Sequence, residues 1–223
     1  MNCGTTMTTK PADALSVVDD DLRRYIETEI LPRYNGFDKA HGIDHAMQVI
    51  GQSMEIARNY DVDAAMVYTV AAYHDTGLCE GRERHHTVSA EILKSDEFLR
   101  RRFDDGQIAT MSEAVEDHRA SAEREPRSIY GRIVAEADRC LDTETVIRRT
   151  IRYGIDHNPD FDRRRHFERS MAHLSKKYGE GGFLKLWIPE SENGRKLAVL
   201  RDLLRKPTEL ERIFDAIYDE EVG

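Results

Sequence analysis

Apolar side chains recur at intervals of three and four residues along most of the chain, the spacing that places them on one face of an α-helix. Few segments alternate apolar and polar residues as a half-buried strand would. Glycine, proline, asparagine and aspartate interrupt the helical runs and predict the turns, and Asp61 is a suitable N-cap for the helix that follows it. The pattern predicts an all-α fold, with helices near residues 16–33, 43–59, 62–75, 86–100, 107–118, 129–141, 143–152, 160–178, 195–204 and 208–219.

These helices are expected to form one compact helical domain over residues 16–155 and a C-terminal helical extension over 156–223. The extension carries large apolar side chains, so we expect it to pack on the same core. Residues 1–15 are polar and lack an apolar core segment. They are therefore expected to be mobile, and to be neither a signal peptide nor a membrane-spanning helix.

Charge and cysteine content restrict the partners. With 33 basic and 42 acidic residues the formal net charge is −9, which argues against duplex nucleic acid as a partner, and no membrane partner is expected. Cys3, Cys79 and Cys140 are far apart, odd in number and form no CxxC pair, so free thiols in a reducing cytoplasm are predicted. A small anionic substrate and a homodimer both stay open.

Several histidines and aspartates fall on the apolar faces of their predicted helices. His74 continues the apolar stripe of its helix and Asp75 follows it directly, while three other helices carry His45, His118 and Asp138 in comparable positions. A buried carboxylate needs a partner, and convergent His and Asp side chains are ligands for first-row transition metals. For His74 and Asp75 the alternative is a hydrogen-bonded pair at a helix end. The histidines of the C-terminal part are expected at the surface: His157, His166 and His173.

These residues resemble a known signature. His45, then His74 and Asp75, then Asp138 match the H…HD…D pattern of the HD-domain superfamily of metal-dependent phosphohydrolases. The flanking segments HGIDHAMQVI, VAAYHDTGL and IVAEADRCLD agree, and the resemblance covers roughly residues 35–145. It implies an all-α HD domain that binds Mn, Fe, Co, Ni or Zn, with Mg also allowed.

A second resemblance concerns the segment RERHHTVSAEIL, which is similar to the HPxxGAxIL segment of the HD-GYP phosphodiesterases, with Ser89 in the place of the glycine. This register implies His85 as a ligand, although helical periodicity alone leaves His86 as its rival. His118 matches the next ligand position, but Arg119 stands where a second histidine would be, and a GYP loop is missing. A cyclic dinucleotide substrate is therefore disfavoured. The order H…HD…H…H…D resembles that of dinuclear HD hydrolases of nucleotides and implies one or two ions.

The resemblance implies hydrolysis of a phosphate ester, of a nucleotide or another small phosphorylated metabolite, by water activated at the metal. The catalytic pair would be His74 and Asp75, with Asp75 bridging two ions. Cationic side chains should neutralise the remaining phosphate charge. The candidates nearest in sequence are Arg82, Arg84, Arg119, Arg127 and His86. Two alternatives stay open, a mixed-valent diiron oxygenase on the same scaffold and a non-catalytic nucleotide-binding regulatory protein.

Overall fold

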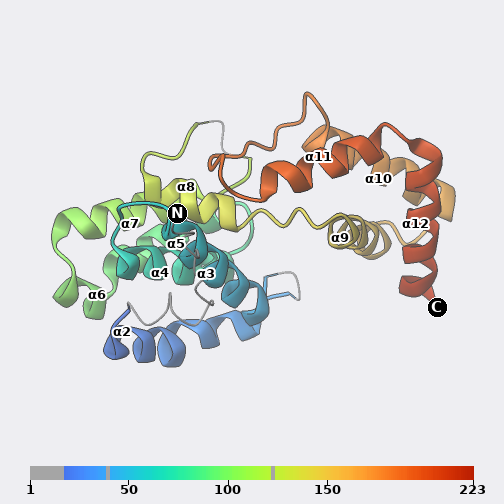
Figure 1. Ribbon diagram of the computed structural model, residues 1–223. Helices are drawn as coiled ribbons and strands as arrows, with labels where there is room; N and C mark the ends of the chain where they lie inside the picture. The colour runs from blue at the N-terminus through green and yellow to red at the C-terminus, as the bar shows by residue number, and fades with distance from the viewer. Residues whose placement is uncertain (1–17, 39–40, 122–123) are drawn as a thin grey trace, which may run out of the picture. The chain divides into compact units, whose positions relative to one another are not determined.

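A computed structural model describes residues 18–38, 41–121 and 124–223 of the chain (Figure 1). The fold is all-α, as the sequence predicts, and the described residues contain no strand. The helices group into two compact units that divide between Asp138 and Arg139. Cys3 and the expected mobile segment 1–15 lie outside the described residues.

The first unit begins with a continuous helical rod whose geometry changes along its length. An α-helix, α2 (Asp20–Tyr25), runs into a π-helix, η1 (Ile26–Ile30), and then a 3-10 helix, η2 (Leu31–Gly36). The other elements of this unit are α3 (Ile43–Ala57), α4 (Ala64–Tyr73), the 3-10 helix η3 (Thr76–Glu80), α5 (His85–Ser95), α6 (Glu97–Arg102), α7 (Asp105–Asp117) and α8 (Ile129–Ala137).

Helix α4 forms the centre of this unit. Every residue from Met66 to Tyr73 is buried, because α3, α5, α7, α8 and η1 pack around it. A helix with no exposed stripe must be apolar all round, and the sequence VYTVAAY meets that requirement. The residues that follow α4 therefore emerge in the interior of the unit rather than at its surface. These residues are His74 and Asp75, both of which are buried.

Aspartates begin several helices and explain two departures from the predicted boundaries. The single helix expected over 86–100 is wrong, because Asp96 adopts an extended conformation there and accepts the backbone N–H groups of Phe98 and Leu99 at 2.9 and 3.1 Å. The side chain of Asp96 thus ends α5 and begins α6. The N-cap expected at Asp61 lies instead at Asp63, whose side chain accepts two N–H groups of the first turn of α4.

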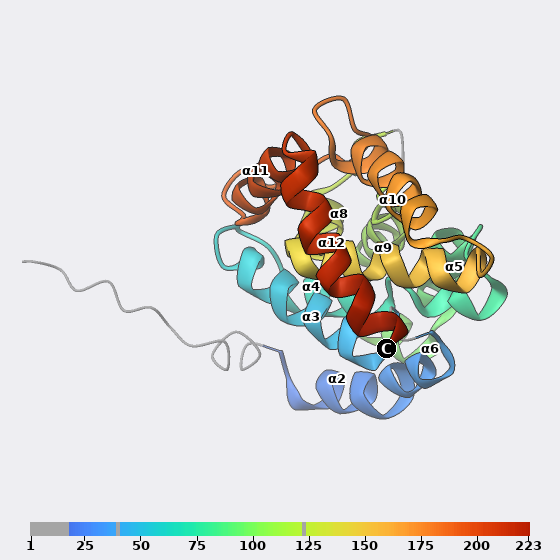
Figure 2. The same cartoon turned by 90° about the vertical axis from the view of Figure 1, so that its right-hand side faces the viewer.

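The second unit consists of four helices, with α12 lying against α9 and α10 (Figure 2). Arginines of α9 pair with acidic residues of α12, as in the contacts of Arg148 and Arg152 with Glu221. His166 lies buried between the rings of Phe161 and Tyr218, so its prediction as a surface residue is wrong. His157 and His173 are exposed, as expected. The helices are α9 (Thr143–His157), α10 (Arg163–Tyr178), α11 (Asn193–Leu204) and α12 (Pro207–Val222).

The division between the two units falls at residue 138 rather than at the expected residue 155. The difference arises because α9 packs on α10 and α12, so it belongs with the C-terminal helices. The packing of residues 156–223 on the core of the first unit stays a prediction. Cys79 and Cys140 are free thiols, as expected. Among the described residues, none of the helices combines the length and the apolar character needed to cross a membrane.

Candidate metal centre

The candidate ligands lie at the ends of helices, where side chains of several elements can converge. His74, His118 and Asp138 each occupy the C-cap position of their helix, α4, α7 and α8. His85 is the first residue of α5, and His45 lies in the first turn of α3. Asp75 follows His74 directly and precedes η3. Helix ends from five elements thus meet beside the buried end of α4.

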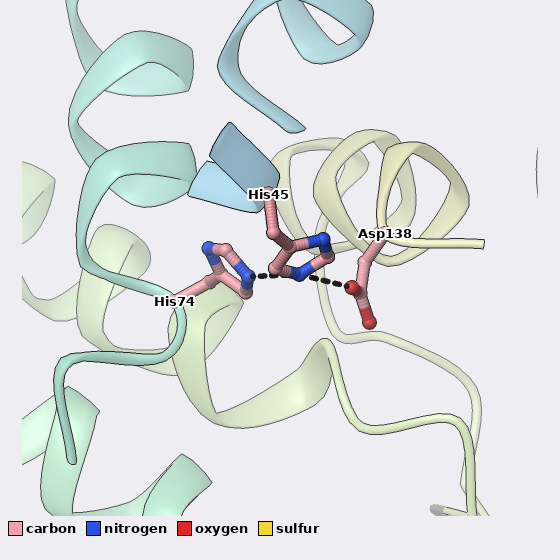
Figure 3. A group of neighbouring side chains, drawn as sticks. All are labelled: His45, His74 and Asp138. Atoms are coloured by element: carbon pink, nitrogen blue, oxygen red, sulfur yellow. Dashed lines mark hydrogen bonds and ion pairs between the residues drawn. The ribbon is translucent and has the colours of Figure 1, made fainter. Parts of the chain in front are cut away.

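One group of ligands consists of His45, His74 and Asp138 (Figure 3). The His45 ring lies between the other two side chains, with its Nε2 atom 3.2 Å from Oδ1 of Asp138 and 3.3 Å from Nε2 of His74. All three candidate ligand atoms lie within 4.8 Å of one another. Both histidines are buried and Asp138 is partly exposed, so this group opens towards solvent on the aspartate side.

The second group consists of Asp75, His85 and His118. The Nε2 atoms of the two histidines are 3.2 Å apart, and each lies 3.4 Å from Oδ1 of Asp75. His85 rather than His86 therefore supplies a ring nitrogen to this group. Periodicity alone did not separate the two residues, since His85 stacks with Val88 and Ile92 and His86 stacks with Ala90 and Leu93.

Asp75 joins the two groups through its two carboxylate oxygens. Oδ1 faces His85 and His118, while Oδ2 lies 3.4 Å from Nε2 of His74 and 3.8 Å from Nε2 of His45. One carboxylate thus stands between two sets of ligands, an arrangement suited to bridging two ions.

The donor spacing fits divalent transition metals. Nitrogen and oxygen ligands lie about 2.0–2.1 Å from Zn²⁺, so two ligands of one tetrahedral ion stand about 3.4 Å apart. Within the first group, His45 lies 3.2 and 3.3 Å from the donors of Asp138 and His74, and in the second group the donors are 3.2 to 3.4 Å apart. Imidazole with carboxylate also suits Fe, Co, Ni and Mn better than Mg, which prefers oxygen ligands alone.

Backbone carbonyls orient three of the histidines for metal binding. The Nδ1 atoms of His74, His85 and His118 lie 2.7, 2.8 and 2.6 Å from the carbonyl oxygens of Ala71, Arg82 and Val115. A carbonyl only accepts, so each Nδ1–H donates to it and each neutral ring turns the lone pair of Nε2 inward. Such outer hydrogen bonds fix the tautomer of histidines that bind metals.

The surrounding charges and burial shift the pKa values of several candidate ligands in the metal-free centre. Burial would raise the pKa of the Asp75 carboxyl, but His74 and His118 hold it well below its ordinary value, so this ligand is ionised. Burial and the neighbouring His118 lower the pKa of His85 to about 4. Burial would also lower the pKa of His74, yet Asp75 and Asp138 outweigh it and raise that pKa to about 9. At neutral pH His85 is therefore ready to bind an ion, and His74 must first lose a proton.

Tyr34 is a contact of the centre that the sequence pattern did not indicate. Its side chain is fully buried, and its hydroxyl donates to the carbonyl oxygen of Ala72 at 2.9 Å and accepts the backbone N–H of Asp75 at 3.3 Å. The tyrosine comes from η2, about 40 residues before the His-Asp pair that it contacts. Burial, together with the nearby Asp75 carboxylate, raises the pKa of Tyr34 well above its ordinary value, so the phenol remains a hydrogen-bond donor.

The expected phosphate-binding cations have different surroundings. Nη2 of Arg82 donates to Nε2 of His41 at 3.1 Å, and the guanidinium is exposed beside Asp38. Arg119 donates to the carbonyl oxygen of Glu83 at 2.8 Å. Arg84 is exposed just before α5, and His86 is half-buried next to His85.

Arg127 is held by acidic side chains of α7 rather than directed to the candidate ligands. Its backbone N–H and its Nε both donate to Oδ2 of the buried Asp117, at 2.8 and 3.0 Å, and its guanidinium also pairs with Glu116. These contacts fasten the loop before α8 to α7, and none of them tests the substrate contact expected for Arg127 from the sequence.

The comparisons with known proteins agree with this geometry. Residues 42–142 match the family described as HD domain, a range that contains all six candidate ligands but not Tyr34. No curated protein and no solved structure matches the chain. The family match and the two His and Asp groups at the signature positions lead to one conclusion: residues 42–142 of the chain form an HD domain.

Proposed function

We propose that this protein is a metal-dependent phosphohydrolase that uses two divalent transition-metal ions to cleave the phosphate ester of a nucleotide or another small phosphorylated metabolite. HD domains are typically metal-dependent phosphohydrolases. The observation that carries the two-ion proposal is the position of Asp75, whose two oxygens face two separate groups of ligands. One ion would be held by His45, His74, Asp75 and Asp138, and the other by Asp75, His85 and His118.

Divalent ions at such a centre polarise phosphate oxygens and lower the pKa of water. The contribution of the chain is to fix the ligands before substrate arrives. Asp75 would contribute to holding both ions, because its side chain is short and buried and its two oxygens face the two groups of ligands. The hydrogen bonds from Nδ1 to backbone carbonyls keep the rings of His74 and His118 from rotating. The partly exposed edges of Asp138 and His85 leave an approach for a phosphate group.

Cations next to the second group are the proposed phosphate contacts. Arg82 and Arg119 are close in sequence to His85 and His118, and each guanidinium is tethered on one side, by His41 and by the Glu83 carbonyl. A tethered guanidinium loses less conformational freedom when it binds an anion than a free one does. Arg84 and His86 are further candidates for contacts with the rest of the substrate.

Two experiments on one preparation test the proposal. The protein, purified without chelator, is analysed for bound metal and then assayed with Mn, Fe, Co, Ni, Zn or Mg against phosphomonoesters, nucleotides and cyclic nucleotides. We expect phosphate release that requires metal and continues without oxygen, and loss of this activity in Asp75→Asn, which keeps the size of the side chain but removes its charge. Substrate turnover that consumes oxygen would indicate a diiron oxygenase instead. Nucleotide binding without turnover by the metal-loaded protein would indicate a regulatory role.

A further inference from the structure

Gly77, two residues after Asp75, lies against the backbone of α5. A Cβ atom at this position would stand 2.3 Å from the carbonyl oxygen of His85, 2.5 Å from the backbone nitrogen of Ser89 and 2.8 Å from Cβ of Val88. Two of these three atoms are backbone and cannot turn away. Only glycine allows so close an approach, so the turn that carries Asp75 and the first turns of α5 are in direct contact.

A buried hydrogen bond fastens this contact. The backbone N–H of Gly77 donates to Oγ of Ser89 at 2.8 Å, and both residues are buried. Ser89 lies four residues after His85 on α5, so the two side chains occupy the same face of the helix, one turn apart. The bond therefore connects the backbone next to one ligand, Asp75, with the helix that carries another, His85.

The serine hydroxyl is a feature of this chain rather than of the segment that it resembles. The HPxxGAxIL segment has glycine at the position of Ser89, and glycine offers no side-chain acceptor. Without the hydroxyl of Ser89, the buried N–H of Gly77 would lose its hydrogen-bond acceptor, which would lower the free energy of unfolding.

We propose that Ser89 is a positioning residue for the second metal ion: its bond to Gly77 sets the distance between Asp75 and His85. This inference rests on the proposed two-ion function. Ser89 belongs to neither group of ligands; it acts through the separation of Oδ1 of Asp75 and Nε2 of His85, which is 3.4 Å. Metal–ligand distances in protein sites agree with their ideal values to about 0.2 Å, so a shift of α5 larger than this should weaken binding of the second ion.

The first ion should be much less sensitive to this contact. It shares Asp75 with the second ion, but the N–H of Asp75 is also held by Tyr34. Its other ligands, His45, His74 and Asp138, come from α3, α4 and α8, and none of them is carried by α5. Loss of the bond between Gly77 and Ser89 should therefore weaken binding of the second ion more than binding of the first. A general loss of stability would weaken the binding of both ions.

The test measures metal binding by Ser89→Ala in the full-length protein, with Mn²⁺ as the probe. We expect the first Mn²⁺ to bind as in the wild type and the second to bind about 10- to 100-fold more weakly, the range for loss of an outer contact of a metal ligand. Electron paramagnetic resonance distinguishes the two states directly, because two bridged Mn²⁺ ions are magnetically coupled and a single ion is not. A loss of fold stability alone would not produce the spectrum of a single bound ion. Ser89→Cys has a side chain of similar size whose sulfur is a weaker hydrogen-bond acceptor. Its affinity for the second Mn²⁺ should lie between that of the wild type and that of Ser89→Ala.

Ser53→Ala is the matched control. Ser53 is another fully buried serine of the same unit, on α3, and its hydroxyl has no hydrogen-bond partner among the described residues. The control should bind two ions like the wild type, and circular dichroism should show that all the variants are folded.

Each other outcome has a separate meaning. If the wild type binds two coupled ions and Ser89→Ala binds them equally well, the positioning role is wrong and the two-ion function stands. If Ser89→Ala loses both ions together, the contact supports the whole centre and the selective role is wrong. If the wild type never binds more than one ion, the proposed two-ion function fails and the positioning role fails with it.

Discussion

Replacing Tyr34 with phenylalanine should weaken metal binding, although Tyr34 lies outside the HD domain at residues 42–142. The substitution removes only the hydroxyl, which donates to the carbonyl oxygen of Ala72 and accepts the N–H of Asp75. Both partners are at the end of α4, where the helix no longer supplies hydrogen bonds to the residues that follow. The backbone of Asp75 would then be held less firmly, and this residue faces both groups of ligands.

The size of the effect follows from the two bonds. A typical hydrogen bond contributes about 0.5–1.5 kcal/mol net, and a buried group left without a partner costs about 1–3 kcal/mol. The bond to Ala72 is short, whereas the one to Asp75 is long at 3.3 Å, so we expect a total loss near 2 kcal/mol, or about 4–8 °C in Tm. Affinity for metal should fall about tenfold at the least, as for other outer contacts of metal ligands.

Tyr73→Phe provides the matched control for this experiment. Tyr73 is also fully buried and lies on α4, but its hydroxyl donates to Oδ2 of Asp96 at 2.7 Å, away from the ligands. Urea unfolding of the metal-free proteins should show a similar loss of stability for both variants. Calorimetric titration with Zn²⁺ or Mn²⁺ should show weaker binding only for Tyr34→Phe. Equal metal affinity in Tyr34→Phe and the wild type would refute the reasoning, as would an equal loss in both variants.

Three further predictions concern the centre and its surroundings. His118→Ala should reduce bound metal from two ions per chain towards one while the helical circular dichroism spectrum persists; unchanged stoichiometry by elemental analysis would contradict the assignment. Because the metal-free fold raises the pKa of His74 from 6.5 to about 9, the protonated ring stabilises the metal-free protein most fully below pH 6.5, and this stabilisation is lost as the pH rises through 9. The same proton competes with metal, so affinity for the first ion should rise about tenfold per pH unit between pH 7 and 9; titrations in buffers of different ionisation enthalpy should detect one released proton, and a flat profile would contradict it. Arg127→Ala should lower the Tm, since it leaves the buried Asp117 with fewer partners, but should change kcat little. A large fall in kcat with normal stability would indicate instead that Arg127 contacts the substrate.

The sequence was informative where a polar residue interrupts an apolar stripe. His74 and His118 continue the buried faces of their helices, and such a position has few explanations other than a hydrogen-bonded core residue or a ligand. Their position on helices could be predicted because periodicity is a local property of the chain. The family signature then supplied the pairing of distant residues, including the placement of His85 that periodicity left open.

The sequence was uninformative where a contact depends on packing between distant segments. Tyr34 reaches Asp75 across about 40 residues, and a single aromatic residue in a helical run predicts burial but no particular partner. His166 stands among arginines in sequence, yet Phe161 and Tyr218 surround it in space, so its charged neighbours misled the prediction. The break at Asp96 was missed because aspartate favours helix starts but also occurs within helices at a modest cost, so one aspartate does not by itself mark a boundary.

The short turn after α4 shows how these distant contacts shape the centre. Helix α4 ends at Tyr73, and the N–H groups of the next residues bond outside that helix: Asp75 donates to the hydroxyl of Tyr34 and Gly77 donates to that of Ser89. The two acceptors come from η2 and α5, so the turn is held from two separate elements. Between these two bonds lies the carboxylate of Asp75, which faces both groups of ligands. If each bond fixes one end of the turn, loss of the Tyr34 hydroxyl should affect both ions, while loss of the Ser89 hydroxyl should affect the ion next to α5.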